Sequence, residues 1–350
     1  MKMLIAIDES RFDYLLPFAD ALSKYGIECK IINDLEIYDD PKNNKIFRWI
    51  KTPKKFLAII NEFKPDLVFT ERVSHFTTLV TKQKIPLLIF LRGDYWTELN
   101  LSKNTMNTSL EKQIILFIKN RIAETNFKKS TLILPICNYL KDIVKKKYPE
   151  KNIATFYQGI DLSYWVEKKQ NKLKHPCVGL LQGANIWGKT EEMLILPKII
   201  ASLPNVTFYW AGDGPYIDKI LPKLEKFKNF KWLGNLDYPN DVRNYLSEID
   251  VYALVTGLDM SPHSLIEAAS MKKPVVATDV GGVKEIMKNN ETGFLIEKGN
   301  TDEWIQKLSL LIDDKEQRKI MGDAGRKFVE EKFIWDKIAK DFSNIIINLL

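Results

Sequence analysis

The chain has 350 residues, 45% hydrophobic and 28% charged, which is enough for two α/β domains of ordinary size rather than one simple core. Its three cysteines are widely spaced and odd in number, which argues against a disulfide framework or a thiolate metal site. Of 52 Lys and Arg and 45 Asp and Glu, residues 1–165 hold 26 and 19, so the first half carries the whole net charge of +7. No zinc pattern, basic zipper or RNA-binding signature accompanies this charge, which argues against nucleic acid as a partner.

The N-terminal segment predicts a βαβ unit, with strands at 2–7 and 28–33 and an amphipathic helix at 12–26. The loop at residues 8–11 reads Asp-Glu-Ser-Arg, so a glycine-rich dinucleotide fingerprint is absent and phosphate binding in this half is not expected. The N-terminus fits a first strand better than a signal peptide, and no apolar stretch reaches the roughly 20 residues of a membrane span. We therefore expect a cytoplasmic protein.

Two further buried strands are predicted at residues 66–70 and 85–91. The loop after the first contains Glu71, Arg72 and His75, and the turn after the second contains Arg92, Gly93 and Asp94. Charged side chains at a strand end serve either structure or catalysis, and the sequence leaves both interpretations open.

Residues 108–129 alternate apolar and cationic positions at roughly helical spacing. They lie within residues 101–150, which hold 10 Lys and Arg and 4 Asp and Glu. An interfacial helix would bury its apolar side chains in an anionic bilayer, where each cation contributes about 1 kcal/mol. A domain helix would pack the same face against a sheet and leave the lysines in solvent. Both interpretations remain open.

A polar, lysine-rich segment at 166–176 marks the predicted domain boundary. The first domain is expected to span 1–168 together with a C-terminal helix at 334–350, and the second domain to span 169–333. Residues 152–165 are expected to form a strand and a glycine turn just before the boundary.

The second half again predicts alternating strands and helices, with the turn Ala-Gly-Asp-Gly-Pro at 211–215 after a strand. Towards its end, Asp259 lies in a polar loop, a helix begins at Ser264, and a short β-branched strand at 274–278 leads to Gly281 and Gly282. We expect this glycine turn to bring the backbone close to a ligand, because open α/β sheets bind ligands at the carboxyl ends of their strands.

The helix that begins at Ser264 offers free N–H groups and the positive end of a dipole to an anion. Asp259 and Glu267 can each accept hydrogen bonds from vicinal hydroxyls, so the stretch suits a phosphate joined to sugars. The alternative is a capping box, in which Ser264 and Glu267 only satisfy backbone donors at the start of the helix.

Asp259-x7-Glu267, followed by EAASMKKPVVATDVGGVKEI and ETGFLI, resembles the nucleotide-sugar site of the retaining family 4 glycosyltransferases, also called glycosyl transferases group 1. The resemblance implies an α/β protein of the GT-B fold, in which two Rossmann-like domains direct parallel sheets at an interdomain cleft and the C-terminal helix crosses back to the first domain. It covers the C-terminal half well and the N-terminal half loosely.

The resemblance also assigns roles to residues. Asp259, in place of the usual Glu, contacts donor-sugar hydroxyls; Glu267 holds the ribose; Lys189 holds the diphosphate; and amides near Ser264 and Leu265 hold phosphate oxygens. The family's arginine position, near Gly183, carries no charge here, so Gln182, Asn185, backbone amides or another cation must replace it. The remaining candidates are Gly212 and Gly214 in the nucleotide-binding turn, Asn235 and Leu236 beside the base, and Arg92 and Asp94 beside the reacting sugar.

The resemblance predicts transfer of a sugar, with retention, from a nucleotide diphosphate sugar to an acceptor hydroxyl, on a glycan or lipid-linked acceptor in polysaccharide or glycoconjugate synthesis. No cofactor or metal is expected, since the chain shows no Asp-x-Asp motif and no histidine cluster. The first domain is expected to bind the acceptor and to touch anionic membrane peripherally at its inner face. Two alternatives remain: a sugar-nucleotide epimerase of the same fold, and a binding module that has lost catalysis together with the arginine.

Overall fold

The computed structural model describes residues 1–8, 12–38, 53–71, 73–105, 109–168, 170 and 172–349. Of the predicted loop residues, Glu9, Ser10, Arg11 and Arg72 lie outside this set. The chain divides into two compact units: unit 1 comprises Met1–Gly159 and Trp335–Leu350, and unit 2 comprises Ile160–Ile334.

The first boundary between the units lies at 159/160, whereas composition predicted 168/169. The intervening residues pack on unit 2, because the Arg326 guanidinium donates to the Trp165 carbonyl at 2.7 Å and to the Leu162 carbonyl at 3.4 Å. The Lys168 amide donates to the Ser247 hydroxyl at 2.9 Å. The segment before the lysine-rich stretch is therefore part of unit 2.

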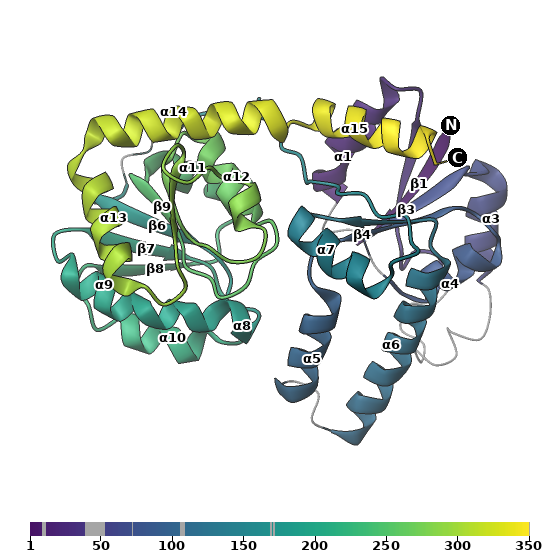
Figure 1. The fold of residues 1–350 in the computed structure, drawn as a ribbon, viewed down its shortest axis with the longest axis horizontal. Helices are drawn as coiled ribbons and strands as arrows, with labels where there is room; N and C mark the ends of the chain where they lie inside the picture. The colour runs from purple at the N-terminus through teal and green to yellow at the C-terminus, as the bar shows by residue number, and fades with distance from the viewer. Residues whose placement is uncertain are drawn as a thin grey trace. The chain divides into compact units, whose positions relative to one another are not determined.

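Unit 1 is built on a five-stranded parallel sheet with the order β2-β1-β3-β4-β5 (Figure 1). The inner strands β1, β3 and β4 are almost continuous apolar runs, as expected of a sheet that helices cover on both faces, whereas the edge strand β2 contains Glu28, Lys30 and Asn33. The predicted strand within 152–165 does not form; this stretch makes only isolated bridges at Ile153 and Ile160. The strands are β1 (Lys2–Ile7), β2 (Glu28–Asn33), β3 (Leu67–Thr70), β4 (Leu87–Leu91) and β5 (Leu132–Pro135).

The C-terminal helix belongs to unit 1, as the resemblance predicted. The Phe18 ring packs against Trp335 and Phe342, with ring centroids 5.4 and 5.2 Å apart, so the last helix completes the core that the first helix begins. Among the described helices, none is long and apolar enough to span a bilayer. The helices of unit 1 are α1 (Phe12–Ser23), α3 (Lys54–Phe63), α4 (His75–Lys82), α5 (Tyr95–Thr105), α6 (Leu110–Lys129), α7 (Asn138–Lys147) and α15 (Trp335–Ile347).

Unit 2 is built on a six-stranded parallel sheet with the order β11-β10-β9-β6-β7-β8. Strand β6 pairs with both β7 and β9, so the chain changes direction across the sheet beside β6. Such a switch point opens a crevice at the carboxyl ends of the strands. The strands are β6 (Cys177–Leu181), β7 (Thr207–Ala211), β8 (Phe230–Gly234), β9 (Val251–Leu254), β10 (Val275–Thr278) and β11 (Gly293–Ile296).

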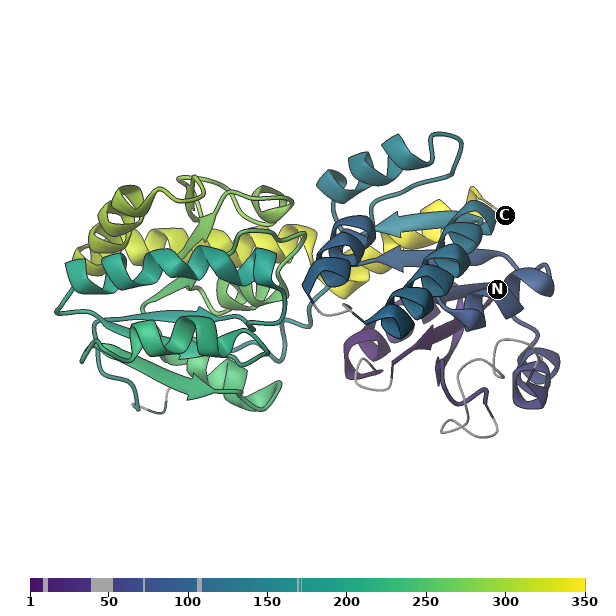
Figure 2. The same cartoon turned by 90° about the horizontal axis from the view of Figure 1, so that it is seen from below.

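Helices cover both faces of this sheet, with α9 and α10 on one face and α11 and α12 on the other (Figures 1 and 2). Trp210 and Trp304 are fully buried in the core beneath α9 and α13. The helices are α8 (Trp187–Thr190), η2 (Glu191–Ile195), α9 (Leu196–Ser202), α10 (Ile217–Leu224), α11 (Asn240–Glu248), α12 (His263–Ser270), η3 (Val283–Glu285), α13 (Thr301–Asp313) and α14 (Lys315–Lys332).

Candidate functional site

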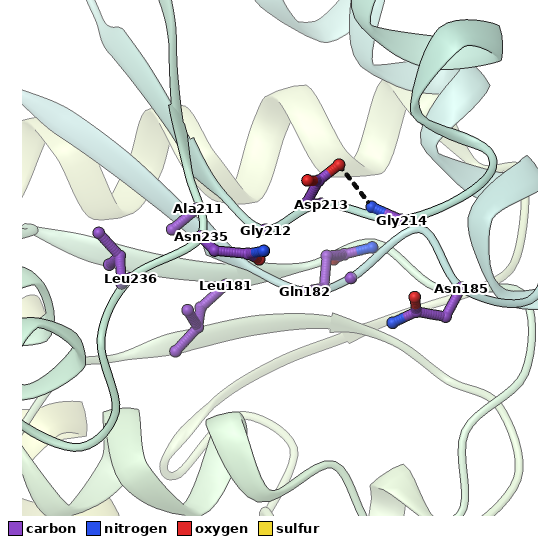
Figure 3. A pocket seen from close by; sticks show the side chains of 10 residues that line it. Leu181, Gln182, Asn185, Ala211, Gly212, Asp213, Gly214, Asn235 and Leu236 are labelled. Atoms are coloured by element: carbon purple, nitrogen blue, oxygen red, sulfur yellow. Dashed lines mark hydrogen bonds between the residues drawn. The ribbon is translucent and has the colours of Figure 1, made fainter.

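A pocket of about 500 Å³ opens at the carboxyl ends of β6, β7 and β8 (Figure 3). Its volume lies in the range of small-molecule sites, roughly 300–1,000 Å³. The pocket brings together six of the residues predicted from the sequence, which come from three separate loops. They are Gln182, Asn185, Gly212, Gly214, Asn235 and Leu236.

Two glycines shape the floor of this pocket. Gly212 and Gly214 both have φ of +146°, and a Cβ atom on Gly212 would lie 2.1 Å from the Gln182 carbonyl oxygen. A Cβ atom on Gly214 would lie 2.6 Å from the Ala184 carbonyl oxygen. Glycine at both positions therefore lets the loop after β7 lie directly on the loop after β6. The Asp213 carboxylate closes the turn by accepting from the Gly214 amide at 2.7 Å (Figure 3).

The loop after β6 contains the position, near Gly183, at which the resembled family has an arginine. The Gln182 side chain donates to the Val255 carbonyl at 2.7 Å and accepts from the Val255 amide at 3.0 Å, so it ties β6 to the end of β9. Ala184 is fully buried. Asn185 is exposed and lines the pocket. Of the two polar substitutes predicted, Gln182 is thus committed to the fold, and Asn185 faces the space that a ligand would fill.

Asp259 and Lys189 form an ion pair beside the start of α8. The ammonium lies 3.4 Å from the nearer carboxylate oxygen, and 15% of the Asp259 side chain and 32% of the Lys189 side chain are exposed. The same carboxylate oxygen accepts from the Met260 amide at 2.9 Å. The Gly257 amide donates to the Lys189 carbonyl at 3.0 Å, which joins the loops that carry the two charges.

The glycine turn after β10 supports Asp259 rather than a ligand. Gly281 has φ of +55°, and a Cβ atom there would lie 2.0 Å from the Asp259 carbonyl oxygen. The Gly282 amide donates to that oxygen at 3.1 Å. The turn thus packs on the backbone of Asp259 and fixes its loop, and the approach of this turn to a ligand stays a prediction.

Helix α12 begins at His263, one residue earlier than predicted, and its N-cap residue Pro262 makes no side-chain cap. The capping box does not form. Instead, Glu267 accepts a hydrogen bond from Nδ1 of His263 at 2.9 Å, one helical turn away. Glu267 is 4% exposed, and a buried carboxylate needs such donors. With Oε1 held by His263, the other oxygen, Oε2, is left to accept from a ligand.

Two other groups at the start of α12, the Ser264 hydroxyl and the Leu265 amide, already make hydrogen bonds within the chain. The hydroxyls of Ser264 and Tyr252 are hydrogen bonded at 2.6 Å, which ties the helix to β9. Burial raises the pKa of Tyr252, so its hydroxyl remains protonated. The Leu265 amide donates to the Pro262 carbonyl at 3.1 Å, so the phosphate contact predicted for it is already taken within the turn.

Arg92 and Asp94, the site residues predicted in unit 1, already interact with other residues of that unit. One guanidinium nitrogen of Arg92 donates to the Gln158 side chain at 3.2 Å, and another lies 3.7 Å from the Glu71 carboxylate. Asp94 is buried and accepts from the amides of Trp96 at 3.1 Å and Thr97 at 3.2 Å. It is therefore the N-cap of α5.

Two residues near the site were missed by the sequence analysis. His263 could have been found from its spacing of four residues to Glu267 on a predicted helix. Lys298 follows β11, and its ammonium lies 3.3 Å from where a Cβ atom on Gly257 would stand and 3.5 Å from the Glu191 carboxylate. The signal for Lys298 was a cation shortly after a predicted strand, at the edge where the other loops converge.

A cluster of potential metal ligands lies at the amino ends of β6 and β9. This is the opposite edge of the sheet from the pocket. His175, Cys177 and Asp250 offer potential metal-ligand atoms within 4.8 Å of one another. The Asp250 carboxylate accepts from the Cys177 amide and from Nδ1 of His175, both at 2.8 Å. Burial raises the pKa of the Cys177 thiol to about 12, so the thiol is protonated at neutral pH.

Solved structures share this fold along the whole chain. Sucrose-phosphate synthase from Thermosynechococcus elongatus has a TM-score of 0.75 at 14% identity, over 100% of this chain and 99% of that one. HepE from Anabaena, in complex with UDP-glucose, has a TM-score of 0.72 at 15% identity, over 99% and 100% of the two chains. The fold is GT-B, as the resemblance predicted.

Residues 193–328 match the family model described as glycosyl transferases group 1. This segment, 136 of the 350 residues, is what the chain shares with that family. The matched segment contains Asp259 and Glu267, together with the loops after β7 and β8.

Curated proteins resemble the chain over part of their length. A GDP-mannose-dependent monoacylated alpha-(1-6)-phosphatidylinositol monomannoside mannosyltransferase from Corynebacterium glutamicum is 31% identical over 169 residues, 45% of this chain and 44% of its own. N-acetyl-alpha-D-glucosaminyl L-malate synthase from Bacillus anthracis is 25% identical over 224 residues, 61% of this chain and 58% of its own. The chain thus spans about half the length of these two relatives.

Proposed function

We propose that this chain transfers a sugar from a nucleotide diphosphate sugar to an acceptor hydroxyl with retention at the anomeric carbon, in polysaccharide or glycoconjugate synthesis. The observation that carries the proposal is the pocket of about 500 Å³ at the carboxyl ends of β6, β7 and β8. Retention rests on the family 4 motif around Asp259 and Glu267.

The nucleoside is proposed to occupy this pocket, with Asn235 and Leu236 beside the base. Glu267 would accept from a ribose hydroxyl through Oε2, since His263 holds Oε1. The close packing of Gly212 and Gly214 on the loop after β6 leaves backbone, rather than side chains, next to the ligand. In the proposal, these contacts determine the affinity of the chain for the nucleoside of the donor.

The diphosphate is proposed to exchange partners with the ion pair. Lys189 would turn from Asp259 to the diphosphate, and Asp259 would accept from donor-sugar hydroxyls. The first turn of α12 adds the positive end of a helix dipole. Fixed positive groups that stabilise a departing diphosphate are worth most in the transition state, so Lys189 is the main catalytic group of the proposal.

Asn185 and Lys298 are proposed to replace the family's arginine. Asn185 lines the pocket, and the ammonium of Lys298 lies beside Gly257, on the loop that is hydrogen bonded to Lys189. No metal is needed for this scheme, since the ammonium groups and the helix dipole supply the positive charge.

The chemical step follows the scheme that the family resemblance implies. The bond from C1 of the sugar to the diphosphate oxygen breaks, and the bond from C1 to the acceptor oxygen forms on the same face. The acceptor proton passes to the departing phosphate, so no protein side chain acts as the base. The acceptor is proposed to bind unit 1.

The names of two relatives point to two different nucleotide bases in the donor, guanine and uracil. The Corynebacterium glutamicum relative is GDP-mannose-dependent, and a further relative from Escherichia coli is a UDP-Gal:alpha-D-GlcNAc-diphosphoundecaprenol alpha-1,3-galactosyltransferase. We propose a uridine or guanosine diphosphate sugar as donor and a glycan or lipid-linked glycan as acceptor. We also propose that the protein is cytoplasmic and that unit 1 contacts the membrane peripherally.

The test is a transfer assay with UDP-, GDP- and ADP-sugars and lipid-linked glycan acceptors, in which NMR reads the anomeric configuration of the product. We expect release of nucleoside diphosphate only when acceptor is present, and a product that keeps the configuration of the donor. An altered sugar nucleotide formed without acceptor would instead establish an epimerase. Binding of nucleotide sugar without turnover would establish a binding module, which the buried Ala184 near the missing arginine favours.

A further inference from the structure

The two halves of α6 differ in their surroundings. In the C-terminal half, Phe127 is fully buried, and the Asn126 side chain donates to the Thr78 hydroxyl of α4 at 2.9 Å. In the N-terminal half, three large apolar side chains are exposed: Leu110 by 75%, Ile114 by 52% and Phe117 by 63%. That half of the helix extends beyond the strands of unit 1, alongside α5 (Figure 1).

These three side chains lie on one face of α6, because residues spaced by four and seven share a face of an α-helix. The same face continues into Arg121 and Lys128, 11 and 18 residues after Leu110, which is close to three and five whole helical turns. We call this set, Leu110, Ile114, Phe117, Arg121 and Lys128, the α6 stripe. It is apolar in the projecting half of the helix and cationic in the anchored half.

The charge around the stripe is one-sided. Three more cations of α6 are exposed, at Lys112, Lys119 and Lys129, and none of the helix's five cations forms an ion pair with another described residue. Of the two acids on the helix, Glu124 already accepts from the Trp96 indole at 3.0 Å and from the Tyr148 hydroxyl. With Glu111 the one exposed acid of α6, the stripe therefore presents apolar side chains beside cations that form no ion pair with any residue the structure describes.

We propose that the α6 stripe docks on an anionic lipid surface, with Leu110, Ile114 and Phe117 in the boundary between headgroups and acyl chains. Arg121 and Lys128 then meet the headgroup phosphates, as in interfacial helices that combine an apolar face with Lys and Arg. A second copy of the chain is a worse partner, because a parallel twofold pairing of α6 would bring these cations against the same cations, and an antiparallel pairing would lay the cations of one copy against the apolar half of the other. Charge complementarity thus selects a negatively charged surface.

The test is flotation of the full chain with phosphatidylcholine vesicles, with and without phosphatidylglycerol, and with no donor present. We expect binding to the anionic vesicles alone, and its loss in 1 M salt, where the Debye length falls to about 3 Å. The double substitution Ile114→Ser/Phe117→Ser should lower the partition coefficient about tenfold or more, since both side chains leave the bilayer. The substitution Arg121→Gln/Lys128→Gln should also weaken binding, through charge alone.

The matched control is Leu310→Ser/Ile320→Ser, which removes two apolar side chains of unit 2 that are 44% and 53% exposed and should leave vesicle binding unchanged. Circular dichroism checks that each variant is folded. No vesicle binding, equal binding to neutral vesicles, or an unaffected Ile114→Ser/Phe117→Ser variant would each overturn the proposal. A wild-type dimer that this variant converts to a monomer, without vesicle binding, would assign the stripe to a second copy. Sugar transfer plays no part in any of these outcomes.

Discussion

The two units share an architecture and differ in what their strand ends carry. In unit 1, the charged side chains at the carboxyl ends of β3 and β4 satisfy one another or a helix end: Arg92 holds Glu71 and Gln158, and Asp94 caps α5. In unit 2, the corresponding edge holds a pocket of about 500 Å³ whose loops pack through glycines. At the start of α12 in the same unit, the buried Glu267 carboxylate is held at Oε1 by His263, the one partner that it has among the described residues.

The comparison shows that a parallel sheet with helices on both faces does not by itself make a ligand site. What distinguishes unit 2 is the loops, where Gly212, Gly214 and Gly281 allow backbone segments to lie closer than any side chain would permit. These contacts fix Asp259 and open space for a ligand. We therefore expect substitutions at the carboxyl edge of the unit 2 sheet to change donor use, and a substitution at the same edge of the unit 1 sheet to change stability alone.

The largest effect is expected from Lys189→Gln. Removing the ammonium that the proposal places on the diphosphate should lower kcat/KM about 10²-fold or more, because the departing charge loses a fixed partner. Steady-state kinetics with the donor measures this. Lys198→Gln is the matched control, since Lys198 is exposed and pairs with Asp302 on the surface. A Lys189→Gln enzyme with normal kinetics would remove Lys189 from the mechanism.

A smaller effect is expected from His263→Ala. The loss of the hydrogen bond to Glu267 frees its carboxylate to rotate, so donor KM should rise about tenfold while kcat changes little, in line with a hydrogen bond to a charged group. His263→Gln keeps a donor in reach and should restore much of the affinity. Equal losses in both variants would mean that His263 acts in some other way than by orienting Glu267.

Lys298→Gln tests which cation replaces the family's arginine. If Lys298 adds charge at the diphosphate, the substitution should lower kcat severalfold to about tenfold, less than at Lys189 because the Lys298 side chain is more exposed, 47% against 32%, and solvent screens its charge more. Lys315→Gln, at the exposed start of α14, serves as the control for net charge. An unchanged kcat would leave Asn185 and backbone amides as the replacements.

The smallest effect belongs to unit 1. Asp94→Ala removes the N-cap of α5 and should lower stability by about 1 kcal/mol, the usual worth of such a cap. Urea unfolding measures this. Donor affinity should be unchanged, because the pocket lies wholly in unit 2. If Asp94→Ala weakened donor binding instead, the contrast between the two edges would fail.

Much of the fold was predictable from local sequence. The strand Lys2–Ile7 and the helix Leu110–Lys129 match the predicted segments closely, because both depend on residues that are close together in the chain. The cap at Asp94 was equally local, and an Asp directly before a helical segment is a typical signal for it. The family resemblance drew attention to catalysis there instead.

The rest depended on contacts between distant segments. Nothing near Ser264 shows that its hydroxyl bonds to Tyr252 of β9, which is why the capping box looked plausible. Likewise, Gly281 is read from sequence as a turn, and only the fold shows that the Asp259 carbonyl occupies the space beside it. The position of the first unit boundary depended on Arg326, which reaches back to Leu162 and Trp165.

The measurement that tests the central claim most directly is calorimetric titration of UDP, GDP and ADP into the wild type and Glu267→Gln, with Glu291→Gln, an exposed surface acid, as control. The account predicts that one nucleotide binds, that Glu267→Gln weakens it tenfold to about a hundredfold through loss of a charged hydrogen bond, and that Glu291→Gln does not. A folded protein that binds none of the three nucleotides, or binds one equally well in all three forms, would contradict a nucleotide site beside Glu267.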